Sequence, residues 1–372
     1  MPIFDQGYQH WSGTLTGHGW RGLTIARHGV RVGNKNRFVR VLLLVSWLPA
    51  LGLAASLCIW GLLERGSSLL RPLMPMLSGF INPQLLQAPR TYRVEAWTIC
   101  FDYFLFIEMY CSMILVLLVG PSLISQDLRF NALPLYFSRP LKRIDYFFGK
   151  LGVIVVFIGM VMIVPSLIAY VLGLLFSFEL SIFKDTFMLL LCSIAYGLLV
   201  AVVSGVLMLS LSSLSRNSRY VGLFWIGFLL LTSMTSGILL GIDHDQRMRE
   251  TYLAAAREAQ AGRNARGPGQ AVPRFAGAEE FATRELENSK TNWRPLVSYT
   301  GNLSRIGHKL VGADAAWLKV SEMQPPGFRE TMQMSFMGPQ YPWYWSAGVL
   351  AVLFGLSVCI LNFRIKSLDR LR

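Results

Sequence analysis

Six long apolar runs divide this chain, and they constrain its fold more than any other feature. A helix needs roughly 20 apolar residues to cross the hydrocarbon core of a bilayer, and each run is long enough. The runs occupy residues 41–63, 97–119, 151–176, 186–211, 221–242 and 342–363. Because a spanning segment in lipid must satisfy its own backbone hydrogen bonds, the runs predict helices. The predicted fold class is an all-α polytopic membrane protein with six transmembrane helices.

The composition supports this fold class and excludes several others. Of the 372 residues, 53% are hydrophobic and only 15% are charged, which is unlike a soluble globule or a disordered chain. The five cysteines all lie in or beside apolar runs, so their spacing predicts neither a disulfide framework nor a thiolate metal cluster. The five histidines lack the close spacing of metal ligands. We therefore predict no metal site and no enzymatic activity in this chain.

The net charge of +14 is concentrated beside particular apolar runs. Basic residues gather before the first run, in the loops after the second and fourth runs, and in the C-terminal tail. These four segments share one side of a six-span protein, and the positive-inside rule makes that side cytoplasmic. Arg65, Arg71, Arg90 and Arg93 in the first outer loop conflict with this rule. We expect both termini inside, anionic lipids as partners of the basic flanks, and no nucleic acid.

The predicted spans divide the chain into four parts. These are residues 1–40, a cytoplasmic tail with an interfacial helix; residues 41–242, the first five transmembrane helices; residues 243–340, a large extracytoplasmic insert between helices 5 and 6; and residues 341–372, helix 6 with a basic cytoplasmic tail. Within the insert, we expect a helix at residues 245–261. We also expect a small, largely helical subdomain at residues 293–320, packed on the membrane face. The insert could bind an extracytoplasmic protein partner.

The loop at residues 120–150, after the second run, has an ordered arrangement of apolar, polar and turn-forming residues that a simple connector does not require. Apolar and polar residues alternate from Leu123 to Leu135, which predicts a short helix at the membrane surface. Pro134 ends or kinks this helix, and residues 138–140 predict a turn. The residues alone leave two interpretations open. The loop is either an ordinary solvated connector or a docking surface for a soluble partner.

The order of residues in this loop resembles the first cytoplasmic loop of ABC-2-type transporter permeases. In that family, an acidic residue precedes a small polar group, a leucine-rich stretch, a Ser/Pro–basic turn and a glycine-lysine pair. The matching residues are Asp127, Asn131, Leu133, Leu135, Ser138, Arg139, Pro140, Arg143, Gly149 and Lys150. Asn131-Ala132 stands where family members often have Gly-Thr. The resemblance covers residues 20–242 and the last span, but not the insert.

This resemblance implies the membrane subunit of an ATP-driven exporter in the cell membrane. Two permease chains, identical or different, would pair with two separate ATP-binding subunits, which would carry the ATP and magnesium. The chain has no G-x-x-x-x-G-K-[ST] motif, so ATP hydrolysis requires another chain, and this one would bind no cofactor. The docking residues that the resemblance implies are Gln126, Asp127, Arg129, Asn131, Leu133, Arg139, Pro140 and Arg143.

Two acidic residues, Asp102 and Glu108, lie inside the second apolar run. An ionisable side chain at such a depth is costly, and it usually faces a cavity, a partner or a pathway. At 100° per residue the two side chains point about 120° apart, so they do not form a paired carboxylate site. Glu108 is either a polar point in a substrate path, a proton relay, or a protonated group hydrogen-bonded between helices or at a dimer seam. Tyr103, Tyr110 and Tyr170 could supply its partners.

Two other functions stay open on the sequence alone. A proton-coupled secondary transporter would use Glu108 and need no ATPase, although the chain shows no inverted repeat. A membrane anchor or assembly protein would act through its extracytoplasmic segment. Such a protein would tolerate changes in the loop at residues 120–150.

Overall fold

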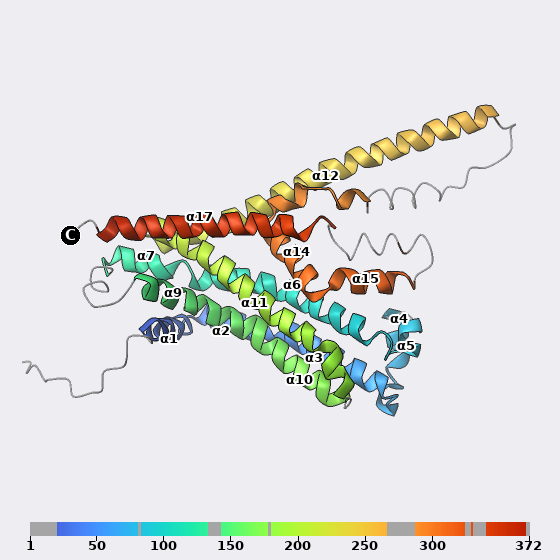
Figure 1. Cartoon of the computed structure of the whole chain (residues 1–372), viewed down its shortest axis with the longest axis horizontal. Helices are drawn as coiled ribbons and strands as arrows, with labels where there is room; N and C mark the ends of the chain where they lie inside the picture. Colours follow the sequence, from blue (N-terminus) through green and yellow to red (C-terminus); the bar gives the residue numbers. More distant parts are fainter. Residues whose placement is uncertain are drawn as a thin grey trace, which may run out of the picture.

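The computed structural model describes residues 21–80, 83–132, 143–177, 180–265, 287–323, 329 and 340–369. Within these ranges every regular element is a helix, as the apolar runs predict. The elements are α1 (Arg21–Gly33), α2 (Arg37–Val45), α3 (Trp47–Glu64), η2 (Ser68–Leu70), α4 (Met74–Phe80), α5 (Pro83–Gln87), α6 (Arg93–Val119), α7 (Ser122–Arg129), α9 (Arg143–Ile158), η3 (Gly159–Ile163), α10 (Val164–Ser177), α11 (Leu180–Leu214), α12 (Ser218–Ala265), η4 (Arg294–Val297), α14 (Tyr299–Val311), α15 (Ala313–Ser321) and α17 (Trp343–Asp369) (Figure 1).

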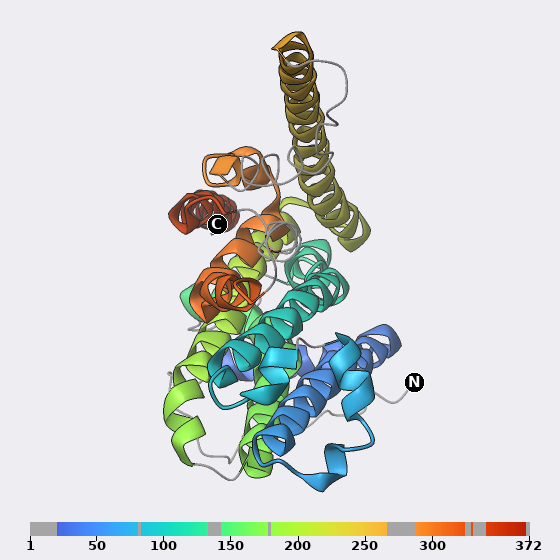
Figure 2. The ribbon, with the colours of Figure 1, turned by 90° about the vertical axis from the view of Figure 1, so that its right-hand side faces the viewer.

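Six helical segments in the described part are long and apolar enough to cross a membrane. They are Arg37–Glu64, Arg93–Arg129, Arg143–Ser177, Ser181–Leu214, Ser218–Glu250 and Trp343–Arg364. Each contains one of the predicted runs, or all of it but one residue, so the number and places of the spans are confirmed. α12 alone has 48 residues, or about 72 Å at the helical rise, and it extends well beyond the other helices (Figures 1 and 2).

α12 differs from the sequence prediction in where it ends. The expected separate helix at residues 245–261 is instead part of α12, which runs unbroken from Ser218 to Ala265. Neither proline nor glycine follows Gly241 before Gly262, so no residue stops the helix where its apolar part ends. The fifth span therefore continues directly into a polar helix.

The third span contains a distortion that local sequence explains. α9, η3 and α10 form one helical segment, in which η3 is a turn of π-helix. Pro165 follows η3 closely and lacks the N–H that would continue regular α-helical bonding. The Ser166 hydroxyl donates to the Ile163 carbonyl (2.9 Å), which satisfies one backbone acceptor beside the proline.

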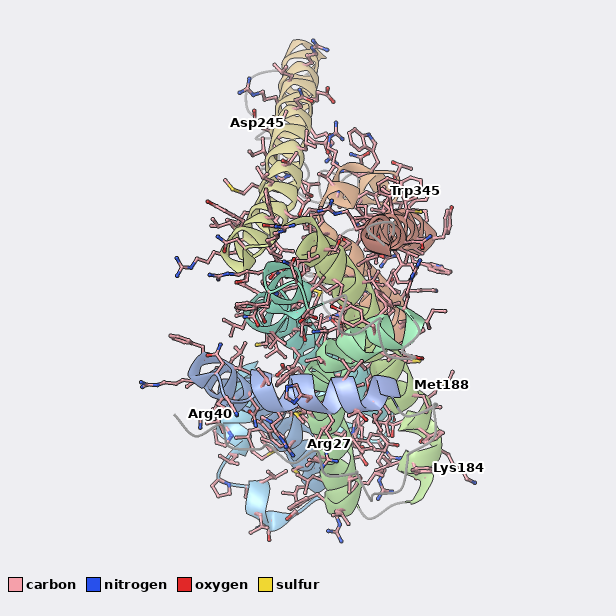
Figure 3. All side chains as sticks on the ribbon, turned by 90° about the vertical axis from the view of Figure 1, so that its left-hand side faces the viewer. Arg27, Arg40, Lys184, Met188, Asp245 and Trp345 are labelled. Carbon is pink, nitrogen blue, oxygen red and sulfur yellow. The ribbon has the colours of Figure 1, made fainter. Side chains whose placement is uncertain are left out.

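α1 packs lengthwise on α9 through glycines on both helices. A Cβ at Gly149 would lie 2.9 Å from the Gly22 carbonyl oxygen and 2.7 Å from the Ile25 Cβ, so the two backbones nearly touch there. Figure 3 shows α1, which carries Arg27, lying across the end of the bundle. A helix in the N-terminal basic segment is thus confirmed. Its place in a membrane interface stays a prediction.

We expect Gly149→Val to lower the free energy of unfolding by about 1–3 kcal/mol, because added side-chain atoms would push α1 away from α9. Gly348→Val on α17 is the matched control, since a Cβ there would meet nothing within 4 Å. Chemical unfolding in detergent, followed by circular dichroism, measures both variants. Equal losses in the two variants would show that the close approach of α1 is unimportant.

α14 lies among the spans, although the insert was expected to pack on the membrane face. The Tyr299 hydroxyl is hydrogen-bonded to Ser204 in the interior of α11 (2.8 Å), and its ring lies 6.2 Å from Trp225 on α12. α14 packs against α6, α11, α12 and α17. Its apolar residues, such as the fully buried Leu303, explain why it enters the bundle. The helical content predicted for residues 293–320 is confirmed, and the side of the membrane stays a prediction.

Candidate functional site

α7 is held rigidly on α11 at one end of the bundle. The Ser212 hydroxyl on α11 accepts hydrogen bonds from the Ile124 N–H (3.1 Å) and the Ser125 N–H (3.0 Å). The same hydroxyl donates to the Pro121 carbonyl (2.9 Å). Leu123 and Ile124 are buried beneath the helix. One serine side chain thus satisfies two free N–H groups in the first turn of α7 and fixes that turn to the fourth span.

Asp127 ties α7 to α9, in the third span. Its carboxylate accepts a hydrogen bond from the Tyr146 hydroxyl (2.6 Å) and pairs with Lys150 (2.7 Å). The side chain is largely covered, with 15% of its area exposed. Asp127 therefore positions α7 within the chain. This contact also gives a structural reason for the lysine of the glycine-lysine pair that opens the third span.

The exposed residues at the end of α7 are Gln126, Arg129, Phe130 and Asn131, which we call the α7 surface. Phe130 is 72% exposed, and the Arg129 guanidinium lies 5.6 Å from the centre of its ring. Asn131 has a left-handed backbone, with a φ of 51°. Asparagine and glycine adopt this conformation most readily, so the asparagine suits the left-handed turn that ends α7. An exposed aromatic ring beside an arginine suits protein docking.

The structure gathers only some of the predicted docking residues. Gln126, Arg129 and Asn131 lie together on the α7 surface, whereas Asp127 lies behind it and Arg143 begins α9 half-buried. Leu133, Arg139 and Pro140 lie outside the described residues. Sequence reasoning missed Phe130, and the available signal was a large aromatic residue within an otherwise polar passage.

Asp102 faces α14. Its carboxylate Oδ1 lies 3.4 Å from the His308 Nδ1, and the neighbouring Tyr103 ring packs edge-on against Trp317 of α15 (5.9 Å). His308 could not be identified from the sequence, because α14 reaches α6 only through the packing of the whole bundle.

Glu108 lies on a different face of α6 and is fully buried. Neither of its carboxylate oxygens has a hydrogen-bond partner within the described residues, and neither does the Ser112 hydroxyl one turn further along. Tyr170, which the sequence offered as a partner, bonds to Thr186 instead (3.1 Å). A hydrogen bond from Glu108 to another helix, one of the interpretations left open, is therefore not seen in the described part of the chain.

Residues 77–298, more than half of the chain, match the model of the ABC-2 family transporter protein. The chain belongs to this family. No curated protein matches it. Family membership, together with six membrane-capable helices, makes this ABC-2 protein a multi-pass membrane protein of the type that serves as the permease subunit of an ABC transporter.

A buried ion-pair cluster closes the end of the ABC-2 protein opposite α7. Arg93, at the start of α6, donates to Glu64 at the end of α3 through Nη2 (2.7 Å) and Nε (2.9 Å). Arg93 also reaches Ser181 (3.2 Å) and Asp185 (3.5 Å) on α11, and Ser177 of α10 donates to Glu64 (3.4 Å). The cluster joins four helices. Glu64 neutralises Arg93. The presence of Arg93 in the first outer loop is therefore only weak evidence against the orientation that the positive-inside rule predicts.

Proposed function

We propose that the chain is the permease subunit of an ATP-driven exporter, and that the α7 surface docks a separate ATP-binding subunit. One observation carries this proposal: a short, rigidly held helix presents an exposed aromatic side chain and an arginine beyond the end of the bundle. Protein–protein interfaces are enriched in aromatic residues, phenylalanine included, and in arginine. The chain itself would hydrolyse no ATP and bind no magnesium.

The anchoring of α7 suits the transfer of force. Movement of a docked subunit would displace α7, and its bonds to Ser212 and Lys150 would carry that displacement to the fourth and third spans. Rigid secondary elements joined by hydrogen bonds and ion pairs can transmit such shifts over long distances.

The end of the bundle that carries α7 would face the cytoplasm. Several helix ends meet there. Arg364, near the end of α17, donates to the carbonyl of Ser213 at the end of α11 (3.3 Å). α7 packs against both α11 and α12. This end is basic, with Arg27 and Arg40 on α1 and α2 (Figure 3). We infer that anionic lipid headgroups surround it and that both termini lie inside.

A second permease chain would complete the transport pathway. α12 and α17 leave much of their apolar surface uncovered, with Leu231 on α12 68% exposed and Val352 on α17 62% exposed. Lipid and a second chain, identical or different, would share this surface. The part of α12 beyond the predicted membrane boundary could bind an extracytoplasmic protein.

Purification of the tagged chain from its native membrane tests the proposal. We expect an ATP-binding subunit to co-purify in roughly equal amount and to hydrolyse ATP in the complex. An unrelated tagged six-span protein from the same membrane controls for contaminating ATPases. Recovery of the intact chain without any ATP-binding subunit, after mild cross-linking in the membrane, would contradict the proposed function.

A further inference from the structure

A carboxyl group lies buried without a partner in the middle of the second span. Glu108 is fully buried, and neither its carboxylate oxygens nor the Ser112 hydroxyl has a hydrogen-bond partner within the described residues. The two side chains are one turn apart and share a face of α6. Buried polar atoms in native proteins almost always have partners, so a carboxyl group and a hydroxyl group that both lack one call for a specific explanation.

Packing at Trp97 shows which way this face of α6 points. The centre of the Trp97 ring lies 5.6 Å from the centre of the Tyr170 ring on α10. A Cβ at Gly173, also on α10, would lie 2.8 Å from the Trp97 ring. Glu108 follows Trp97 by eleven residues, which is about three helical turns, so it points to the same side about 16 Å further along. The third span runs antiparallel to α6, which brings η3 to the depth of Glu108. η3 indeed packs against α6.

The element opposite Glu108 is the irregular part of the third span. η3 is the π-helical turn before Pro165, and π-turns occur frequently at functional sites. Val161 and Met162 in η3 are buried, so this turn belongs to the core of the bundle. An unpartnered carboxyl group and a π-helical turn thus meet in one seam, which we call the α6–η3 seam.

No basic side chain in the described part of the chain forms an ion pair with Glu108. The ion pairs of the described residues do not include it, and η3 has no titratable side chain. The titratable side chains on the other helices around this part of α6 are Cys58 on α3, Tyr170 on α10, Cys192 and Tyr196 on α11, Tyr299, Arg305, His308 and Lys309 on α14, and Asp314 and Lys319 on α15. The basic side chains among these that have identified partners pair elsewhere: Arg305 with Asp314 (2.7 Å), Lys319 with Glu95, and His308 with Asp102, on another face of α6.

We propose that the α6–η3 seam is a proton-binding site, with the Glu108 carboxyl group as the acceptor. An unpaired carboxylate is costly inside a membrane protein, so the packed seam holds Glu108 in its neutral, protonated form. Opening of the seam lets water reach the group. The O–H bond then breaks, the proton passes to water, and the carboxylate remains. Proton binding thereby favours the packed arrangement of α6 and η3. This inference goes beyond the proposed function and does not depend on it.

Infrared spectroscopy of the purified full chain tests the protonation state. At neutral pH the wild type should show the carbonyl stretch of a protonated carboxylic acid, and Glu108→Gln should lack it. Asp102→Asn is the matched control in the same helix, and it should retain the band. If Glu108→Gln leaves the carboxylic-acid band unchanged and removes carboxylate bands instead, Glu108 is ionised and the proposal is wrong.

Hydrogen exchange measured by mass spectrometry tests the link to packing. As the pH rises, after correction for intrinsic exchange rates, the amides of η3 should exchange at least about tenfold faster in the wild type than in Glu108→Gln. Peptides from α12 serve as an internal control, since their exchange should be alike in both proteins and shows that the variant is folded. Identical pH dependence at η3 in the two proteins would overturn the proposal.

Discussion

Replacement of Arg93 by methionine should lower the free energy of unfolding by about 3–5 kcal/mol. The arginine and Glu64 are exposed to only 7% and 2%, and they bond through two nitrogens of the guanidinium. Methionine keeps most of the side-chain length but removes the charge. Glu64 would then remain as a buried charge without a counterion, which is the main source of the expected loss.

The double variant Glu64→Gln/Arg93→Met separates charge from packing. It should recover most of the lost stability, because no uncompensated buried charge is left at the site; Asp185, which also loses its partner, is 48% exposed. Arg249→Met is the matched control: Arg249 pairs with Asp245 (3.0 Å), but the two side chains are 75% and 62% exposed, so we expect a change of at most about 1 kcal/mol. Unfolding in mixed detergent micelles measures all three variants. If Arg93→Met costs no more than Arg249→Met, the cluster does not hold the four helices together.

Replacement of Phe130 by serine should reduce the amount of ATP-binding subunit that co-purifies by about tenfold or more. The ring is 72% exposed and makes few contacts within the chain, so its loss should leave the fold intact. Removing a central aromatic side chain from an interface commonly costs about 2 kcal/mol or more, which exceeds a tenfold change in affinity.

Tyr220→Ser provides the matched control for Phe130→Ser. Tyr220 is also an exposed aromatic residue, at 58%, and it begins α12 at the same end of the bundle. Its replacement should leave co-purification unchanged. The comparison is quantitative immunoblotting of equal amounts of purified chain. Equal retention of the ATP-binding subunit by both variants would exclude Phe130 from the interface.

The places of the spans could be predicted because the constraint is local. A helix that crosses lipid must be apolar along its own length, so each span can be recognised from its own residues. The entry of α14 into the bundle could not be predicted in this way. It depends on contacts such as Tyr299 with Ser204, which join segments far apart in the chain. The fusion of the expected helix at residues 245–261 with α12 follows from the absence of proline and glycine between Gly241 and Gly262.

In the candidate site too, the sequence predicted local features but not contacts between segments far apart in the chain. The sequence indicated a surface helix in the loop after the second span, and the angle between Asp102 and Glu108 followed from helical geometry. The structural role of Asp127 could not follow from the loop alone, because its partners Tyr146 and Lys150 lie on α9. Similarly, the contact of Asp102 with His308 depends on where α14 lies.

A photo-activated cross-linking residue in place of Gln126 tests the central claim most directly. Gln126 is exposed on the α7 surface, and the experiment is done in the native membrane with the full chain. The account predicts a cross-linked product that contains a peptide of an ATP-binding subunit, and no such product when the residue is placed at Tyr220. Products formed with lipid alone at position 126, in membranes where the ATP-binding subunit is present, would contradict it.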